Sequence, residues 1–251
     1  MIADALKMAF GTLTTVRVPA PKLIDRRVAG GAMVLAPLAV VPLAAVASVI
    51  VYSGDLVGLP AFASAALAIG AVALGSRGLH LDGLADTADG LGASYDRERA
   101  LEVMRRGDSG PTGIATLVLV LLVQVGALAG AISAGHGVAA AAIAVVAGRG
   151  VLSLCCAHGV PSARPEGLGA TVAGSVPVWT AALVFAVLAG GAALVLPWRQ
   201  GLIAVALGYL AASALLARCV QRLGGVTGDV LGGCVEVAVA GILVASSFCG
   251  V

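Results

Sequence analysis

Three aspartates lie close together in the stretch HLDGLADTADG, in a chain whose charged residues make up only 11% of the sequence. If this stretch is helical, Asp82, Asp86 and Asp89 share one face within about 60° of arc. Carboxylates that close repel one another unless a cation lies between them, and Mg²⁺ is the ion that bridges carboxylates to phosphates. The spacing therefore predicts a Mg²⁺ site, with an exposed acidic helix face as the alternative. His80 is a candidate ligand or general base, or a structural hydrogen-bonding residue.

A basic segment, RERALEVMRRGDSGPTG, follows the aspartates. Its pattern predicts an amphipathic surface helix that begins after an N-cap at Asp96. Guanidinium groups such as those of Arg105 and Arg106 bind phosphate oxygens in a bidentate fork, so they are typical partners of a pyrophosphate beside a metal. The glycines of GDSGPTG precede a helix N-terminus, where backbone N–H groups can accept an anion.

Two further polar runs rich in glycine lie far along the chain. ARPEGLGAT contains Arg164 and Glu166, and GGVTGDVLGG contains Thr227 and Asp229. Runs of this type are often simple turns. Because functional residues concentrate on loops, we predict that both runs contribute to one site with the aspartates.

The elements that position these residues are predicted to be membrane helices. The 251 residues are 60% hydrophobic, with a mean hydropathy of +1.06, far above the values of soluble domains. The alternating polarity of a porin-like barrel is missing. We therefore expect an all-α integral membrane protein, a single domain over residues 1–251, with no cleaved signal peptide and no nucleic-acid-binding tract. About 20 apolar residues span a bilayer, which predicts seven spans, at 34–53, 60–79, 113–133, 137–157, 176–196, 201–220 and 231–250.

The Lys and Arg residues favour alternate connections between these spans. They are frequent before the first span and after the second, fourth and sixth, whereas the other connections carry only Asp55 and Arg199. Positive residues stay on the cytoplasmic side. The N-terminus, the segment 80–110 and the loops 158–175 and 221–230 are thus predicted to lie on the cytoplasmic face of the cell membrane.

Two ionisable residues, Arg149 and Glu236, fall within predicted spans. Ionisable residues at membrane depth are costly and usually mark a polar cavity, so we expect a substrate-binding cavity role, with pairing between the two as one arrangement. The cysteines occupy apolar surroundings, and we interpret them as small buried hydrophobes rather than as disulfide or metal residues. They are Cys155, Cys156, Cys219, Cys234 and Cys249.

Five motifs in order resemble the cobalamin synthases, also called adenosylcobinamide-GDP ribazoletransferases. They are LTTVRVP, HLDGLADTADG, RERALEVMRRGDSGPTG, RPEGLG and GGVTGDVLGGCVE, which together extend from Leu13 to Glu236. Two positions depart from the family pattern. The segment RRGDSGPTG replaces a more usual DSR.GT.G, which affects the phosphate contacts around Arg105, and Cys234 stands at a usual alanine.

The resemblance implies a membrane-embedded, Mg²⁺-dependent transferase. It would join adenosylcobinamide-GDP to α-ribazole or α-ribazole 5′-phosphate and release GMP. Metal binding would fall to Asp82, Asp86 and Asp89, and the base would be His80, Asp86 or Asp89. Contacts to substrate or phosphate would come from the remaining polar residues of the motifs and spans, namely Arg105, Arg106, Arg149, Arg164, Glu166, Thr227, Asp229 and Glu236.

Two other functions stay open at this point. A phospholipid-forming CDP-alcohol phosphotransferase would share the metal and the reaction type, but Asp86 stands where its signature has an arginine. A small-molecule transporter would explain Arg149 and Glu236 at membrane depth, although the polar clusters gather on one side. A homo-oligomer, or a complex with other corrinoid-pathway enzymes, is also left open.

Overall fold

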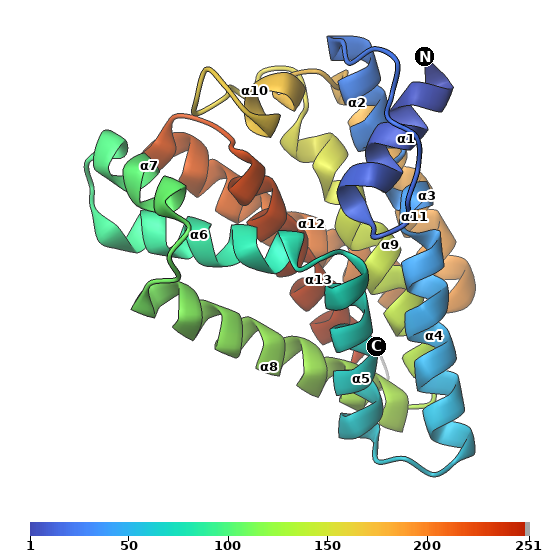
Figure 1. Cartoon of the computed structure of the whole chain (residues 1–251). Helices are drawn as coiled ribbons and strands as arrows, with labels where there is room; N and C mark the ends of the chain where they lie inside the picture. The colour runs from blue at the N-terminus through green and yellow to red at the C-terminus, as the bar shows by residue number, and fades with distance from the viewer. Residues whose placement is uncertain (249–251) are drawn as a thin grey trace.

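The computed structural model describes residues 1–248, which form helices and two isolated β-bridges but no strand (Figure 1). The predicted all-α membrane class is therefore confirmed. The helices are α1 (Ile2–Leu13), α2 (Arg26–Val34), α3 (Ala36–Ala39), α4 (Val41–Leu56), α5 (Ala61–Gly75), α6 (Leu79–Ala93), α7 (Arg97–Arg106), α8 (Pro111–Ser133), α9 (Gly137–Cys155), α10 (Leu168–Val172), α11 (Val178–Val195), α12 (Trp198–Leu223) and α13 (Gly228–Ser246).

Fewer helices than the predicted seven are long and apolar enough to cross a membrane by themselves. Within the described residues α8, α9, α11, α12 and α13 meet this condition, and α5 with α6 makes a sixth if the bent pair counts as one span. The end of the last predicted span, at 249–250, lies outside the described residues.

The two remaining predicted spans are interrupted for identifiable reasons. In the first, Pro37 and Pro42 lie at the beginnings of α3 and α4, and α4 alone has 16 residues. Proline lacks the N–H that would continue the preceding helix, so it begins a new one. In the second, Arg77 and Gly78 adopt positive φ angles, and α6 leaves α5 at 90°. The aspartates therefore lie on a separate helix that crosses the direction of α5 (Figure 1).

The last helix, α13, is the centre of the bundle and packs against α12, α6, α9 and α8. Small residues permit these close crossings. A Cβ added to Gly241 of α13 would lie 3.1 Å from the Cα of Gly208 on α12. Such contacts between small residues are the usual basis of helix packing in membranes.

The polar segments that are distant in the sequence meet at one end of the bundle. Ser162 forms a bridge with Val226, and Arg97 donates hydrogen bonds to the carbonyls of Leu223 (2.7 Å) and Ala163 (3.0 Å). The segment 80–110 and the loops 158–175 and 221–230 are thus on one face, as predicted. Four cysteines are buried with free thiols, as expected, and Cys249 lies outside the described residues.

Candidate active site

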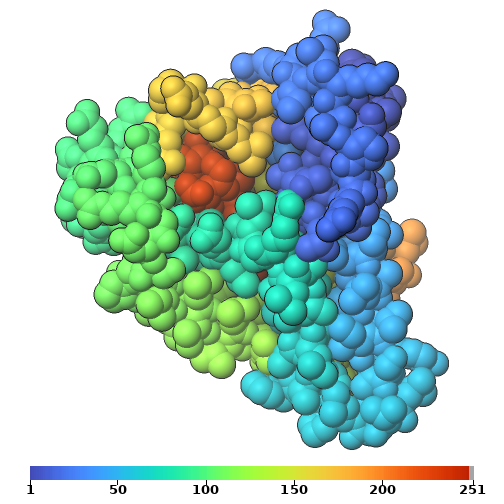
Figure 2. All heavy atoms as spheres, in the orientation of Figure 1, coloured from blue at the N-terminus to red at the C-terminus, as the bar shows by residue number. Residues whose placement is uncertain are grey.

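A pocket of about 280 Å³ opens where these polar segments meet. Figure 2 shows it as a hollow between α6 and the α10 segment, with the beginning of α13 at its floor. Its walls come from four of the five motifs noted in the sequence. The lining residues with chemistry are Thr12, His80, Asp82, Arg164, Glu166, Thr227 and Asp229. Six of these seven were predicted from the sequence, and only Thr12 was not.

Glycines bring α6 and α13 into backbone contact at the pocket. A Cβ on Gly83 would lie 2.6 Å from the carbonyl oxygen of Asp229, and one on Gly232 would lie 3.1 Å from the Cα of His80. No side chain can be accommodated between the two backbones at these distances. The glycines therefore allow residues of two helices, including Asp82 and Asp229, to line the same pocket.

The loop before α13 fixes the orientation of Asp229. Thr227 is the N-cap of α13, because its Oγ1 accepts a hydrogen bond from the N–H of Val230 (3.2 Å). The same hydroxyl donates to Oδ2 of Asp229 (3.1 Å). Arg164 places Nη1 3.9 Å from that Oδ2, while its Nη2 donates to the carbonyl of Leu101 (2.8 Å). Arg164 therefore supplies positive charge at the pocket wall from a fixed position.

The aspartates of α6 are confirmed to be on a helix, but they have different surroundings. Asp82 is exposed in the pocket. Asp86, one turn further along α6, is only 8% exposed and does not itself line the pocket. The charges that act on it are those of Asp82, Asp229 and Asp89, opposed by Arg164. Within residues 1–248 no group donates a hydrogen bond to the carboxylate of Asp86. We call Asp82, Asp86, Arg164, Thr227 and Asp229 the pocket cluster.

Asp89 faces away from the pocket and binds the N-terminus of α8. Its Oδ2 accepts from the N–H of Gly110 (2.7 Å) and its Oδ1 from the N–H of Gly113 (2.8 Å). A carboxylate in this position satisfies free N–H groups and interacts favourably with the helix dipole. The anion-binding turn predicted in GDSGPTG is thus present, and the anion bound there is a side chain of the protein itself.

Arg105 and Arg106, predicted to contact phosphate, lie on the exposed helix α7 and do not line the pocket. The predicted cap is confirmed, since Asp96 accepts from the N–H of Arg99 (2.8 Å). Arg106 pairs with Glu102 at 2.8 Å, and Arg99 pairs with the same carboxylate at 2.7 Å. These hydrogen bonds, that of Arg106 first, lower the pKa of Glu102. In the structure this segment is therefore a surface helix with ion pairs along its exposed side.

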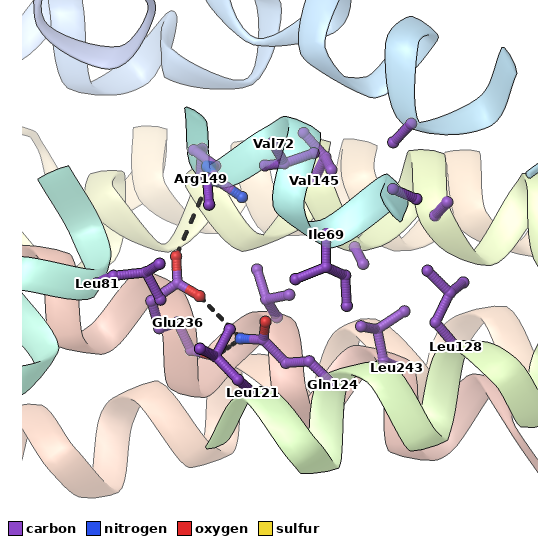
Figure 3. A pocket seen from close by; sticks show the side chains of 16 residues that line it. Ile69, Val72, Leu81, Leu121, Gln124, Leu128, Val145, Arg149, Glu236 and Leu243 are labelled. Atoms are coloured by element: carbon purple, nitrogen blue, oxygen red, sulfur yellow. Dashed lines mark hydrogen bonds and ion pairs between the residues drawn. The ribbon is translucent and has the colours of Figure 1, made fainter. Parts of the chain in front are cut away.

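Arg149 and Glu236 do not line this pocket either, but belong to a second polar group (Figure 3). Nη2 of Arg149 lies 4.0 Å from Oε1 of Glu236, so the predicted pairing is confirmed. Gln124, which the sequence analysis missed, donates to Oε2 of Glu236 at 2.8 Å. The sequence feature that could have indicated Gln124 is that it is an isolated amide in the apolar helix α8. We call Gln124, Arg149 and Glu236 the buried cluster, and all three border a cavity of about 40 Å³ with otherwise apolar walls.

The acidic residues of the pocket are suited to a divalent ion held jointly with a ligand. Within residues 1–248 no three His, Cys, Asp or Glu side chains are grouped so as to hold a metal ion alone. Mg²⁺ is commonly bound by one or two carboxylates together with substrate phosphates. Asp82 and Asp229 are close enough to influence each other electrostatically, and both line the pocket. This donor set fits Mg²⁺.

Comparison with known proteins shows the family of the chain. An adenosylcobinamide-GDP ribazoletransferase of a Nocardioides species is 43% identical over 242 residues, which cover 96% of this chain and 97% of the relative. The enzyme of the same name from Frankia casuarinae is 39% identical, covering 94% and 92%, and that from Mesorhizobium japonicum is 36% identical, covering 92% and 88%. No solved structure matches the chain. The family described as cobalamin-5-phosphate synthase matches residues 5–247, and the chain belongs to that family.

Proposed function

We propose that this protein is the transferase that joins adenosylcobinamide-GDP to α-ribazole or α-ribazole 5′-phosphate, the final step of cobalamin assembly. Relatives with this name cover nearly the whole chain. The observation that carries the proposal is the pocket, where acidic and basic residues of separate motifs meet beside the membrane helices. A phospholipid synthase or a transporter is disfavoured by the family to which the chain belongs.

The reaction replaces a phosphoanhydride bond to GMP by a phosphoester bond to the ribazole. The oxygen of a ribazole hydroxyl bonds to the phosphorus attached to cobinamide, the bond from that phosphorus to the GMP oxygen breaks, and GMP leaves. The hydroxyl proton must be removed. Of the three predicted bases, Asp89 is engaged at both oxygens, and His80 faces the guanidinium of Arg149. Asp86, whose carboxylate receives no hydrogen bond from the described residues, is the base we propose.

We assign the binding of Mg²⁺ to Asp82 and Asp229. The ion would neutralise charge on the diphosphate oxygens, which is the main need of phosphoryl-type transfer. Thr227 fixes the carboxylate of Asp229 by a hydrogen bond, and Arg164 at the wall is placed to bind a phosphate oxygen through its guanidinium. Glu166, which is exposed at the rim, is a candidate contact to the ribazole.

The test is a reconstitution in lipid. Purified protein with adenosylcobinamide-GDP, α-ribazole and Mg²⁺ should release GMP and form a cobalamin in equal amounts, and EDTA should stop both products. Release of GMP without a cobalamin would indicate hydrolysis and contradict the proposed transfer. Full activity after removal of divalent ions would contradict the assignment of Mg²⁺ but not the proposed transfer.

We also propose that the pocket faces the cytoplasm, because the connections at this end carry most of the Lys and Arg residues. The test uses cysteines at exposed positions on opposite ends, Tyr95→Cys and Asp55→Cys, each combined with Cys249→Ser. The other four native thiols are buried. A membrane-impermeant thiol reagent should label only Asp55→Cys in intact cells. Labelling of Tyr95→Cys instead would reverse the orientation.

A further inference from the structure

His80 connects the pocket to the buried cluster. It lines the pocket, yet its side chain is almost fully enclosed, at 3% exposure. Its Nδ1 lies 3.4 Å from Nη2 of Arg149, which in turn lies 4.0 Å from Oε1 of Glu236. One guanidinium nitrogen, with two protons, therefore faces both a ring nitrogen and a carboxylate oxygen.

This contact determines which ring nitrogen of His80 carries the proton. A guanidinium only donates hydrogen bonds, so Nδ1 must offer its lone pair, and a neutral imidazole then has its proton on Nε2. A doubly protonated ring would place a second positive charge against Arg149, which is itself only 1% exposed. Like charges at such short range repel strongly in the interior of a protein.

The proton on Nε2 is available to a ligand. Within residues 1–248 no group accepts a hydrogen bond from Nε2, whereas Nδ1 faces Arg149. Nε2 is also not one of the fully enclosed side-chain atoms that lack a partner, which in this region include Nε of Arg149 and Nε of Arg164. Because His80 borders the pocket, a bound molecule is the acceptor within its reach. The ring therefore presents a donor to the same space as Asp82 and Arg164.

The rest of the buried cluster holds Arg149 in this position. Gln124 donates to Oε2 of Glu236 at 2.8 Å and to the backbone carbonyl of the same residue at 3.1 Å. With Oε2 engaged, Oε1 is the oxygen directed to Arg149, as the dashed contacts of Figure 3 show. The carboxylate of Glu236 also balances the charge of the guanidinium, whereas an isolated buried cation would have no such compensation.

We propose that Arg149 is a positioning residue that holds His80 in the Nε2–H tautomer, so that His80 donates a hydrogen bond to a phosphate oxygen of the bound diphosphate and does not act as the base. The contact to phosphate rests on the proposed function, whereas the tautomer does not. A donor aimed at an oxygen that gains charge during the reaction stabilises the transition state. His80 would thus act beside the carboxylates without competing for the proton.

The tautomer can be observed without substrate. The chain has three histidines, so nitrogen NMR of protein labelled in its histidine side chains, in lipid, gives few signals, and His80→Gln identifies those of His80. We expect an unprotonated Nδ1 and a protonated Nε2 in the unmodified protein, and a mixture of tautomers in Arg149→Met. A protonated Nδ1 in the unmodified protein overturns the proposal, even if Arg149→Met fails to fold.

The role of the donor is tested by two amide variants. The amide of His80→Gln reaches approximately the position of Nε2 and can donate but cannot act as a base, whereas the amide of the matched control His80→Asn is too short. We expect His80→Gln to keep at least about a tenth of the turnover, and His80→Asn to lose about 100-fold, the usual effect of removing one such donor. Equal losses of turnover in the two variants would overturn the proposed contact to phosphate. The assignment of the His80 tautomer would still be decided by the NMR experiment. Absence of activity in the unmodified protein would count against the proposed function, not the tautomer.

Discussion

The pocket cluster and the buried cluster each have one carboxylate on α13, Asp229 and Glu236, but their charges are organised differently. In the pocket cluster the carboxylates of Asp82, Asp86 and Asp229 act on one another, and only Arg164 opposes them. In the buried cluster one guanidinium meets one carboxylate, whose other oxygen accepts from an amide. The first arrangement leaves negative charge uncompensated, whereas the second is balanced.

This difference separates a site for a ligand from a structural pair. Like charges that are held together lower the stability of a fold unless a cation or ligand joins them, so their presence in a pocket indicates binding. A balanced pair needs no ligand to neutralise its charge, and its main effect is on the stability and register of the helices. Substitutions in the two clusters should therefore affect different measurements.

The largest effect is expected for Asp86→Asn. The change removes the proposed base while keeping the shape of the side chain, and turnover should fall by about 10²–10⁴-fold, the usual contribution of general base catalysis. The melting temperature should not decrease, because one of several repelling charges is removed. Steady-state GMP release and thermal unfolding in detergent measure the two quantities. Asp55→Asn, at an exposed position far from the pocket, is the matched control. Turnover near that of the unmodified protein would leave Asp86 without a catalytic role.

Arg149→Met should act mainly on stability. It leaves the buried carboxylate of Glu236 with only Gln124 as a partner, and breaking one side of a buried ion pair costs about 3–5 kcal/mol. Thermal unfolding should show a lower melting temperature, and the double variant Arg149→Met/Glu236→Gln should recover part of the loss, because no charge then remains. If the double variant is less stable than Arg149→Met, the two residues are not a compensating pair.

Much of the pocket cluster was predictable because local spacing controls it. The helical positions of Asp82 and Asp86 follow from their separation by four residues, and Asp229 was expected in the same site because functional residues concentrate on loops. The role of Asp89 was not predictable in this way. The spacing of Asp89 places it on the same helix face, but its carboxylate binds the N-terminus of α8, more than 20 positions away in the sequence.

The outline of the membrane helices was predictable from hydropathy, but their breaks were less so. Apolar composition is the same in a straight span and in one that turns at Arg77 and Gly78, and the glycine was the available signal for the 90° bend. The buried cluster required contacts between Gln124 and Glu236, which are 112 positions apart. Hydropathy shows that each of these polar side chains lies in an apolar segment, but it does not show which residue is its hydrogen-bond partner.

The link between Asp89 and α8 should contribute a smaller amount to stability. A Cβ in Gly113→Ala would overlap the carboxylate of Asp89 and lie 2.9 Å from the carbonyl oxygen of Ala85. Overpacking of this kind costs about 1–3 kcal/mol, and thermal unfolding should show it. Gly126→Ala on the same helix is the control, since no heavy atom lies within 4 Å of its added Cβ. Equal melting temperatures for the two variants would show that α8 does not depend on this contact.

The smallest effect is expected for Arg106→Gln, which compares a predicted arginine on the surface helix with Arg164, the predicted arginine that lines the pocket. Exposed ion pairs such as that of Arg106 with Glu102 contribute little, so kcat/KM should stay within about twofold of the unmodified protein. Arg164→Gln carries the same change at the pocket wall and should lower kcat/KM by about 10-fold or more, as expected for the loss of a charged hydrogen bond to phosphate. A large loss in Arg106→Gln together with a small one in Arg164→Gln would mean that α7 moves over the pocket when substrate binds. The basic segment would then belong to the site when substrate is bound. The separation of the pocket cluster from the surface helix α7 would hold only in the protein without its substrates.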